Sequence, residues 1–185
     1  MHKLVLFASG SGSNVENIAN YFEANSEVKV AGVFTNKTDA GVIERCKRLG
    51  IPCYIFTNAA YLDASFIDMV KSFSPSLIVL AGFLKKISPS FVKAFENKIV
   101  NVHPALLPKF GGKGMYGMNV HKAVVSAGEI ETGITIHRVD EIYDNGTVVA
   151  QFRVRLDGTE TPEEVAQKVH ELEYQYFPKT IESLL

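Results

Sequence analysis

The regular alternation of strand-length and helix-length segments restricts the fold of this chain more than any other feature. Short apolar runs predict strands, at residues 3–8, 28–35, 53–56, 77–81 and 99–103. The stretches between them repeat apolar residues at helical spacing, at about 14–24, 40–49, 62–73 and from 88 onward. Strands that alternate with helices form parallel sheets covered on both faces. The sequence therefore predicts an α/β fold with an open, mostly parallel sheet and helices on both faces.

The pattern changes after His103, and the second part of the chain predicts a different arrangement. Residues 104–118 are rich in Pro and Gly and too long for a plain connector, so we expect a functional loop. A turn-like D-E-I-Y-D-N-G separates two further predicted strands, which we expect to form a late antiparallel extension. The elements predicted here are a helix at 119–126, strands at 133–139 and 147–156, and a closing helix at 162–184.

Composition and charge exclude several classes of partner. The 185 residues include 46% hydrophobic and 21% charged side chains, as in a globular protein of one domain. A net charge of −1 provides no electrostatic footprint for nucleic acid or an anionic membrane. The apolar N-terminal run is shorter than a signal peptide requires, and no segment approaches a membrane span. We therefore expect a cytoplasmic protein.

The run I-V-N-V-H-P from Ile99 to Pro104 carries the most specific chemical signal. Side chains alternate along a strand, so Asn101 and His103 point to the same side. Pro104 ends the strand, and ligands of open α/β sheets bind at the carboxyl ends of strands. An amide donor beside an imidazole suits an acyl-transfer transition state, in which a carbonyl oxygen gains negative charge. A strand-end histidine with a turn-forming asparagine is the alternative.

The Gly/Ser-rich turn S-G-S-G-S-N follows the first strand and precedes the first helix. Its backbone N–H groups and the helix N-terminus favour an anion, and the hydroxyls suit a single phosphate. The spacing is neither G-x-G-x-x-G nor the G-K-[ST] form of nucleotide triphosphatases. A structural turn in which Ser13 caps the helix explains the same residues equally well.

Two carboxylates in the second part of the chain are further candidates. Asp144 lies in a D-N-G turn, where a carboxylate beside His103 would stabilise its charged form and accept a proton. An ordinary turn aspartate is the alternative. Glu173 lies at the edge of the apolar stripe of the last helix, where a solvated flank position would also explain it. His121 and His137 are expected to be structural.

Together these motifs resemble the phosphoribosylglycinamide formyltransferase family of 10-formyltetrahydrofolate-dependent enzymes. The resemblance covers essentially the whole chain, through S-G-S-G-S-N, L-A-G-F-L-K-K-I-S-P, N-V-H-P-A-L-L-P-K and D-E-I-Y-D-N-G. It implies a single-domain Rossmann-like fold over 1–185, with a phosphate- and nucleotide-binding half at 1–100 and a catalytic and folate-binding half at 101–185. Lys85 stands where many relatives have arginine, and the loop G-G-K-G-M-Y-G differs from the shorter form of many bacterial members.

The resemblance also assigns roles to particular residues. The catalytic trio falls on Asn101, His103 and Asp144. The substrate-binding positions are Ser11, Gly12, Ser13 and Asn14 for the phosphate, with Pro104, and Glu173 for the ribose. The folate-binding positions are Leu84, Lys85, Lys86 and Ile87, with Asp140, Glu141, Ile142 and Tyr143. No metal is expected.

The activity implied is transfer of the formyl group of 10-formyltetrahydrofolate to the amine of 5'-phosphoribosylglycinamide in purine biosynthesis. The amine attacks directly, a charged His103 and Asn101 stabilise the tetrahedral oxyanion, and Asp144 supports His103. The partners expected are these two small molecules, with a monomer or weak homodimer. The alternatives are another folate-dependent formyltransferase or 10-formyltetrahydrofolate hydrolase, which should carry an additional domain, and a non-catalytic nucleotide-binding α/β module.

Overall fold

The computed structural model describes the backbone of residues 1–185 and all side chains except those of residues 58 and 62. The chain divides into two compact units, Met1–Val100 with Leu185, and Asn101–Leu184. The seven strands follow the order β3-β2-β1-β4-β5-β6-β7, and the boundary between the units falls inside β5. The assignment of 1–185 to one formyltransferase domain, with its two functional halves, stays a prediction.

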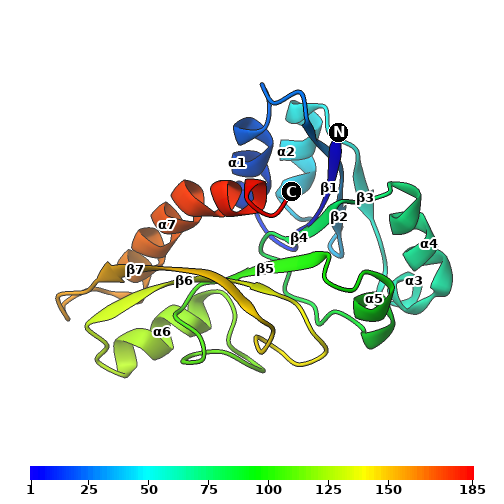
Figure 1. The fold of residues 1–185 in the computed structure, drawn as a ribbon. Helices are drawn as coiled ribbons and strands as arrows, with labels where there is room; N and C mark the ends of the chain where they lie inside the picture. Colours follow the sequence, from blue (N-terminus) through cyan, green and yellow to red (C-terminus); the bar gives the residue numbers. More distant parts are fainter. The chain divides into compact units, whose positions relative to one another are not determined.

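The strands of the first unit are parallel, as the sequence predicts (Figure 1). They are β1 (His2–Phe7), β2 (Val28–Thr35), β3 (Cys53–Ile55) and β4 (Leu77–Leu80). All four residues of β4 are buried, which agrees with its position in the middle of the strand order. The α/β, mostly parallel fold class is confirmed.

Helices cover both faces of the sheet in this unit, with α1 and α2 on one face and α4 and α5 on the other (Figure 1). Their bounds are α1 (Ser13–Tyr21), α2 (Val42–Leu49), α3 (Asn58–Leu62), α4 (Ala64–Ser72) and α5 (Pro89–Ala94). The single helix predicted at 62–73 is wrong at its start, because Asp63 adopts an extended conformation and caps α4 by accepting from the Ser65 amide. Ser88 caps α5 as its sequence predicts.

An aromatic cluster fills the core between the sheet and the α4–α5 face. Phe7 and Phe34 are cross-strand partners on β1 and β2, and their rings stack at 5.2 Å. Phe66 of α4 and Phe91 of α5 meet the Phe7 ring edge-on at 6.3 and 5.7 Å. Such pairs add to the free energy of apolar burial. The cluster therefore holds α4 and α5 against the sheet. The loops of the first unit extend from the ends of these same strands.

The second unit contains an antiparallel pair, so the predicted antiparallel extension is confirmed. Its elements are the end of β5 (Ile99–His103), then α6 (Met118–Ser126), β6 (Glu131–Arg138), β7 (Val148–Arg155) and α7 (Pro162–Glu182). Helix α7 begins with a capping box between Thr161 and Glu164, and packs on β6, β7 and α6. Among the helices described, none combines the length and apolar character that a membrane crossing requires.

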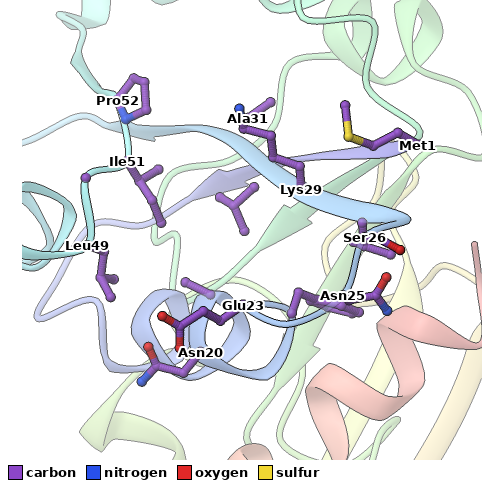
Figure 2. Close-up of a pocket in the computed structure, with 15 residues that line it drawn as sticks. Met1, Asn20, Glu23, Asn25, Ser26, Lys29, Ala31, Leu49, Ile51 and Pro52 are labelled. Atoms are coloured by element: carbon purple, nitrogen blue, oxygen red, sulfur yellow. The ribbon is translucent and has the colours of Figure 1, made fainter.

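A surface pocket of about 540 Å³ lies in the first unit, and Figure 2 shows the side chains around it. It is lined by the end of α1, the start of β2 and the segment that follows α2, through residues such as Asn20, Lys29 and Pro52. These segments lie at the amino ends of the strands, whereas ligands of open α/β sheets bind at the carboxyl ends. None of the predicted site residues lines this pocket.

Candidate active site

Strand β5 presents Asn101 and His103 at its carboxyl end, as predicted. Asn101 is half-buried and His103 is only 3% exposed. The Nε2 atom of His103 lies 2.8 Å from the carbonyl oxygen of Phe110. Because a carbonyl only accepts, Nε2 carries a hydrogen and donates it. In the neutral imidazole the lone pair is therefore on Nδ1.

His137 fixes the amide of Asn101, and this is a contact that the sequence reasoning missed. His137 Nδ1 lies 2.9 Å from the carbonyl of Arg138, so Nδ1 donates and Nε2 of the neutral ring accepts. The acceptor Nε2 lies 3.1 Å from Asn101 Nδ2, which donates one of its two hydrogens. The second hydrogen of the amide is left for another acceptor. His137 is thus structural in a specific sense, because it orients a predicted catalytic group.

A change of strand register accompanies His137. Ile136 pairs with Ala150 of β7, whereas His137 pairs with Val148, so the register shifts between these residues. Irregularities of this kind redirect side chains and occur next to active sites. No local pattern along T-I-H marks this shift, because residues 132–137 of β6 are all buried and their burial does not alternate.

Asp144 completes the predicted trio. Its φ of 53° lies in the left-handed region, which aspartate tolerates in turns. One carboxylate oxygen, Oδ2, accepts from the amide of Gly112 at 2.9 Å and lies 3.6 Å from His103 Nδ1. The other, Oδ1, lies 3.7 Å from His137 Nε2. Asn101, His103 and Asp144 are therefore brought together, with His137 as a fourth member.

The protonation state of His103 differs from the sequence-based expectation of a charged imidazole. Burial disfavours the charged form and lowers the pKa of His103 below its usual value of 6.5. The Asp144 carboxylate and the Phe110 carbonyl act in the opposite direction but do not outweigh burial. A charge on His137, were that ring protonated, would lower the pKa further, and the charge of Glu173 raises it. At neutral pH the resting imidazole is therefore mainly neutral.

Thr135 and Gln151 brace the chain that follows the half-buried Pro104. The Thr135 hydroxyl donates to the Ala105 carbonyl at 2.7 Å and accepts from the Leu107 amide at 3.0 Å. Gln151 Nε2 donates to the Leu107 carbonyl at 2.9 Å. The segment after His103 is thus tied to β6 and β7, which holds the start of the loop in place.

Glu173 is buried, so its interpretation as a solvated flank residue is wrong. It is 5% exposed on α7, and its Oε2 lies 3.0 Å from His170 Nδ1. Its charge also raises the pKa of His121, whereas burial, the larger effect, lowers it. A buried carboxylate that interacts with three histidines, including His103, places negative charge among the groups of the second unit's site.

In the first unit, the predicted phosphate loop connects β1 to α1. Helix α1 begins at Ser13, and Gly12 with a φ of 79° occupies the N-cap position, so Ser13 is not the cap. A Cβ atom at Gly12 would lie 2.5 Å from Val42 Cγ2, so glycine is required by both conformation and packing. Ser11 is exposed, Ser13 is half-buried and Asn14 is buried. Of these loop residues, Ser11 is therefore the most accessible from solvent.

The predicted folate-binding segment Leu84–Ile87 is held by two residues outside it. The amide of Leu84 donates to Ser9 Oγ at 3.0 Å, and the Tyr61 hydroxyl donates to the Lys86 carbonyl at 3.3 Å. Lys85 Nζ lies over the Tyr61 ring, 4.9 Å from its centroid, which is a cation–π contact. Leu84 is exposed and Ile87 is buried.

The second predicted folate-binding segment is a turn stabilised by its first residue. Asp140 Oδ1 accepts from the Ile142 amide at 2.8 Å, and Oδ2 accepts from Asn145 Nδ2 at 3.2 Å. Glu141, Ile142 and Tyr143 are exposed. Asp140 therefore shapes the turn, while two large apolar side chains remain accessible on it. Among the described residues, no group of three or more His, Cys, Asp or Glu side chains is arranged to hold a metal ion.

Comparison with known proteins identifies relatives over the whole chain. A family model described as formyl transferase matches residues 2–181. Phosphoribosylglycinamide formyltransferase of Bacillus subtilis is 36% identical over 100% of this chain and 95% of its own length. The chloroplastic phosphoribosylglycinamide formyltransferase of Arabidopsis thaliana is 40% identical over 97% of this chain. The chain spans 64% of the length of that relative and 60% of the one from Vigna unguiculata.

Solved structures that resemble this chain include proteins of the same name as these relatives. The crystal structure of glycinamide ribonucleotide transformylase 1 from Geobacillus kaustophilus superimposes with a TM-score of 0.90 at 34% identity, covering 100% of this chain and 99% of that one. That of phosphoribosylglycinamide formyltransferase from Streptococcus pneumoniae gives a TM-score of 0.87 at 34% identity. The chain therefore belongs to the formyl transferase family, and the relatives that it matches over nearly their whole length are phosphoribosylglycinamide formyltransferases.

Proposed function

We propose that this chain transfers the formyl group of 10-formyltetrahydrofolate to the glycinamide amine of 5'-phosphoribosylglycinamide, in purine biosynthesis. The observation that carries the proposal is the grouping of Asn101, His103 and Asp144 with His137 at the end of β5 and β6. Membership of the formyl transferase family supports the same chemistry. The relatives' names supply the acceptor, since the B. subtilis protein is a phosphoribosylglycinamide formyltransferase.

The geometry supports a direct transfer. The amine attacks the formyl carbon, and the carbonyl oxygen becomes an oxyanion, which the second N–H of Asn101 is free to stabilise. The attacking nitrogen must lose a proton. His103 Nδ1 carries a lone pair in the neutral ring and lies 3.6 Å from Asp144, so it accepts this proton while the carboxylate stabilises the imidazolium. As the intermediate collapses, the carbonyl re-forms, the bond to the folate nitrogen breaks, and the His103 imidazolium returns its proton to that nitrogen, so that tetrahydrofolate leaves as a neutral amine.

The remaining predicted residues have binding roles in this proposal. The backbone amides of the loop at Ser11–Asn14 bind the substrate phosphate. The N-cap residue of α1 is Gly12, so no side chain of the cap accepts from these amides. Glu173 accepts from the ribose hydroxyls, and Pro104 lies beside the substrate. The pterin contacts the segments Leu84–Ile87 and Asp140–Tyr143, whose shapes are fixed by Tyr61 and Asp140.

Location and assembly are part of the proposal. We expect a monomer or weak homodimer in the cytoplasm that binds these two small molecules and no nucleic acid, in keeping with a net charge of −1. Sedimentation at several concentrations tests the assembly state. Fractionation of cells that express the protein tests the location.

The decisive experiment incubates the protein with 10-formyltetrahydrofolate in the presence and absence of 5'-phosphoribosylglycinamide, and follows tetrahydrofolate, formate and the formylated nucleotide. Formation of equal amounts of tetrahydrofolate and formylated nucleotide supports the proposal. Release of formate without the acceptor would indicate a hydrolase instead. Nucleotide binding with no turnover would indicate a non-catalytic module. The His103→Ala variant, which should be nearly inactive, controls for contaminating enzymes.

A further inference from the structure

Helix α2 holds two consecutive carbonyl groups of the phosphate loop. The Val42 amide donates to the Gly10 carbonyl at 3.1 Å, and Arg45 Nε donates to the Ser11 carbonyl at 2.8 Å. In a planar trans peptide the C=O and N–H groups point in opposite directions. The N–H groups that share these two peptide planes, those of Ser11 and Gly12, are therefore directed away from α2.

The guanidinium of Arg45 is itself fixed by Glu16 of α1. Its Nη1 group pairs with Glu16 Oε2, while Arg48 pairs with the other carboxylate oxygen. The Arg45 side chain is 30% exposed and that of Arg48 is 65% exposed. Of these two arginines, Arg45 is the one that donates to the loop. The two therefore share a carboxylate partner but differ in their contact with the loop.

Arginine is suited to this position because its donors lie in one rigid plane. Nε and Nη1 donate at the same time to Ser11 on the loop and to Glu16 on α1. A lysine ammonium is a compact charge on a flexible stem and cannot reproduce this paired geometry. The positive charge is balanced by Glu16, so the contribution of Arg45 is to orient a peptide rather than to supply charge to a ligand.

We propose that Arg45 is a positioning residue for the substrate phosphate. It holds the Ser11–Gly12 peptide with its N–H group directed away from α2, so that the loop offers preorganised amide donors to a phosphate monoester. This inference rests on the proposed function and adds a residue from α2 to the site. Val42 assists through its backbone amide, which donates to the Gly10 carbonyl.

The test compares Arg45→Met with the matched control Arg48→Met, using 5'-phosphoribosylglycinamide and the riboside that lacks the phosphate. Losing a hydrogen bond to a charged donor should raise the KM of Arg45→Met for the nucleotide by ~10-fold or more. The kcat should change far less, as should the kcat/KM for the riboside. Arg48→Met should stay within about 2-fold of the unmodified enzyme. Arg45→Lys should recover little of the lost affinity.

Direct binding, followed by calorimetry, separates this inference from the proposed function. An unmodified protein that binds the nucleotide better than the riboside but transfers no formyl group contradicts the proposed function alone. Equal nucleotide affinity in Arg45→Met and the unmodified protein overturns the positioning role, as does an equal loss in Arg45→Met and Arg48→Met. Similar binding of nucleotide and riboside by the unmodified protein overturns it too. Urea unfolding of both variants shows whether the loss of the Glu16 pair affects stability equally.

Discussion

Asn101 Nδ2 donates to His137 Nε2 at 3.1 Å, and the opposite nitrogen of that ring donates to the backbone carbonyl of Arg138. The backbone of β6 therefore sets the tautomer of His137, and the tautomer sets which way the Asn101 amide faces. A freely rotating amide would present its oxygen or its nitrogen to an incoming oxyanion. The contact with His137 holds the amide in one orientation, with Nδ2 bound to the ring, and a fixed donor is the preorganisation that stabilisation of a developing charge requires.

The first prediction follows from this contact. Asn101→Ala removes the donor and should lower kcat by ~10²–10³ with little effect on nucleotide affinity. His137→Phe keeps the ring volume but removes the acceptor, so the amide is released and kcat should fall by a smaller factor. His137→Gln restores an acceptor and should recover part of the loss. The measurement is steady-state kinetics with both substrates.

An unchanged kcat in His137→Phe would show that Asn101 is oriented without His137. The loss of kcat caused by Asn101→Ala would then be independent of the His137 ring. In the double variant, with both substitutions, the losses of transition-state stabilisation would add. Non-additivity, with the double variant no slower than Asn101→Ala, is the expected result for residues that act as a unit.

The end of β5 could be predicted from sequence, and its partner on β6 could not. N-V-H-P combines strand alternation with a proline stop, and both are local properties of the chain. His137 depends on a register shift between β6 and β7, which is a tertiary feature without a local signature. The break at Asp63 was missed for a different reason, since an aspartate that caps α4 also fits within a continuous helical pattern.

Protonation was the least predictable property of the site. From sequence, a carboxylate beside His103 indicates a raised pKa, because opposite charges favour ionisation. The structure shows that the ring is 3% exposed, and burial has the larger and opposite effect on the pKa. The burial of a side chain depends on all the segments that pack around it. The direction of the net pKa shift can therefore be given only once the fold is known.

The second prediction concerns the pH dependence of Asp144→Asn. Asp144 raises the pKa of His103, so removing its charge should lower that pKa further. If neutral His103 accepts the proton, activity is lost as the pH falls through this pKa. The acid limb of the kcat/KM profile should therefore move to lower pH in the variant. The plateau should fall, because the imidazolium formed during transfer loses its carboxylate partner.

NMR titration of the His103 ring in both proteins provides the independent check. A ring titration that moves down together with the acid limb supports the assignment. An acid limb that moves to higher pH, or a plateau that does not change, would contradict it. The apparent values belong to the group of interacting residues rather than to His103 alone.

The third prediction compares two glycines of the phosphate loop. A Cβ atom at Gly12 would lie 2.5 Å from Val42 Cγ2 and 2.7 Å from Val42 Cα, at a φ of 79°. Gly12→Ala should therefore cost more than about 1 kcal/mol of stability and raise the KM for the nucleotide. A Cβ atom at Gly10 would meet nothing within 4 Å, so Gly10→Ala is the matched control. Urea midpoints and KM values that change equally in the two variants would refute the specific role of Gly12.

The last prediction uses two histidines whose pKa values move in opposite directions. Burial lowers the pKa of His121 from its usual 6.5, whereas a hydrogen bond with Glu173 raises that of His170. For His121, the unfolded chain binds a proton below pH 6.5 that the folded protein does not, so stability is lost as the pH falls below that value. For His170, the stabilisation is fully present below pH 6.5 and is lost as the pH rises through its folded pKa.

Replacing each histidine with glutamine removes the titration while keeping a polar side chain. His121→Gln should therefore flatten the loss of stability on acidification, so that its urea midpoint falls less than that of the unmodified protein between neutral and acidic pH. His170→Gln should do the reverse, with a stability deficit that is greatest in acid and shrinks as the pH rises. Urea midpoints measured across this range for the three proteins provide the comparison. Parallel curves for all three would show that neither ring contributes to the pH dependence of stability.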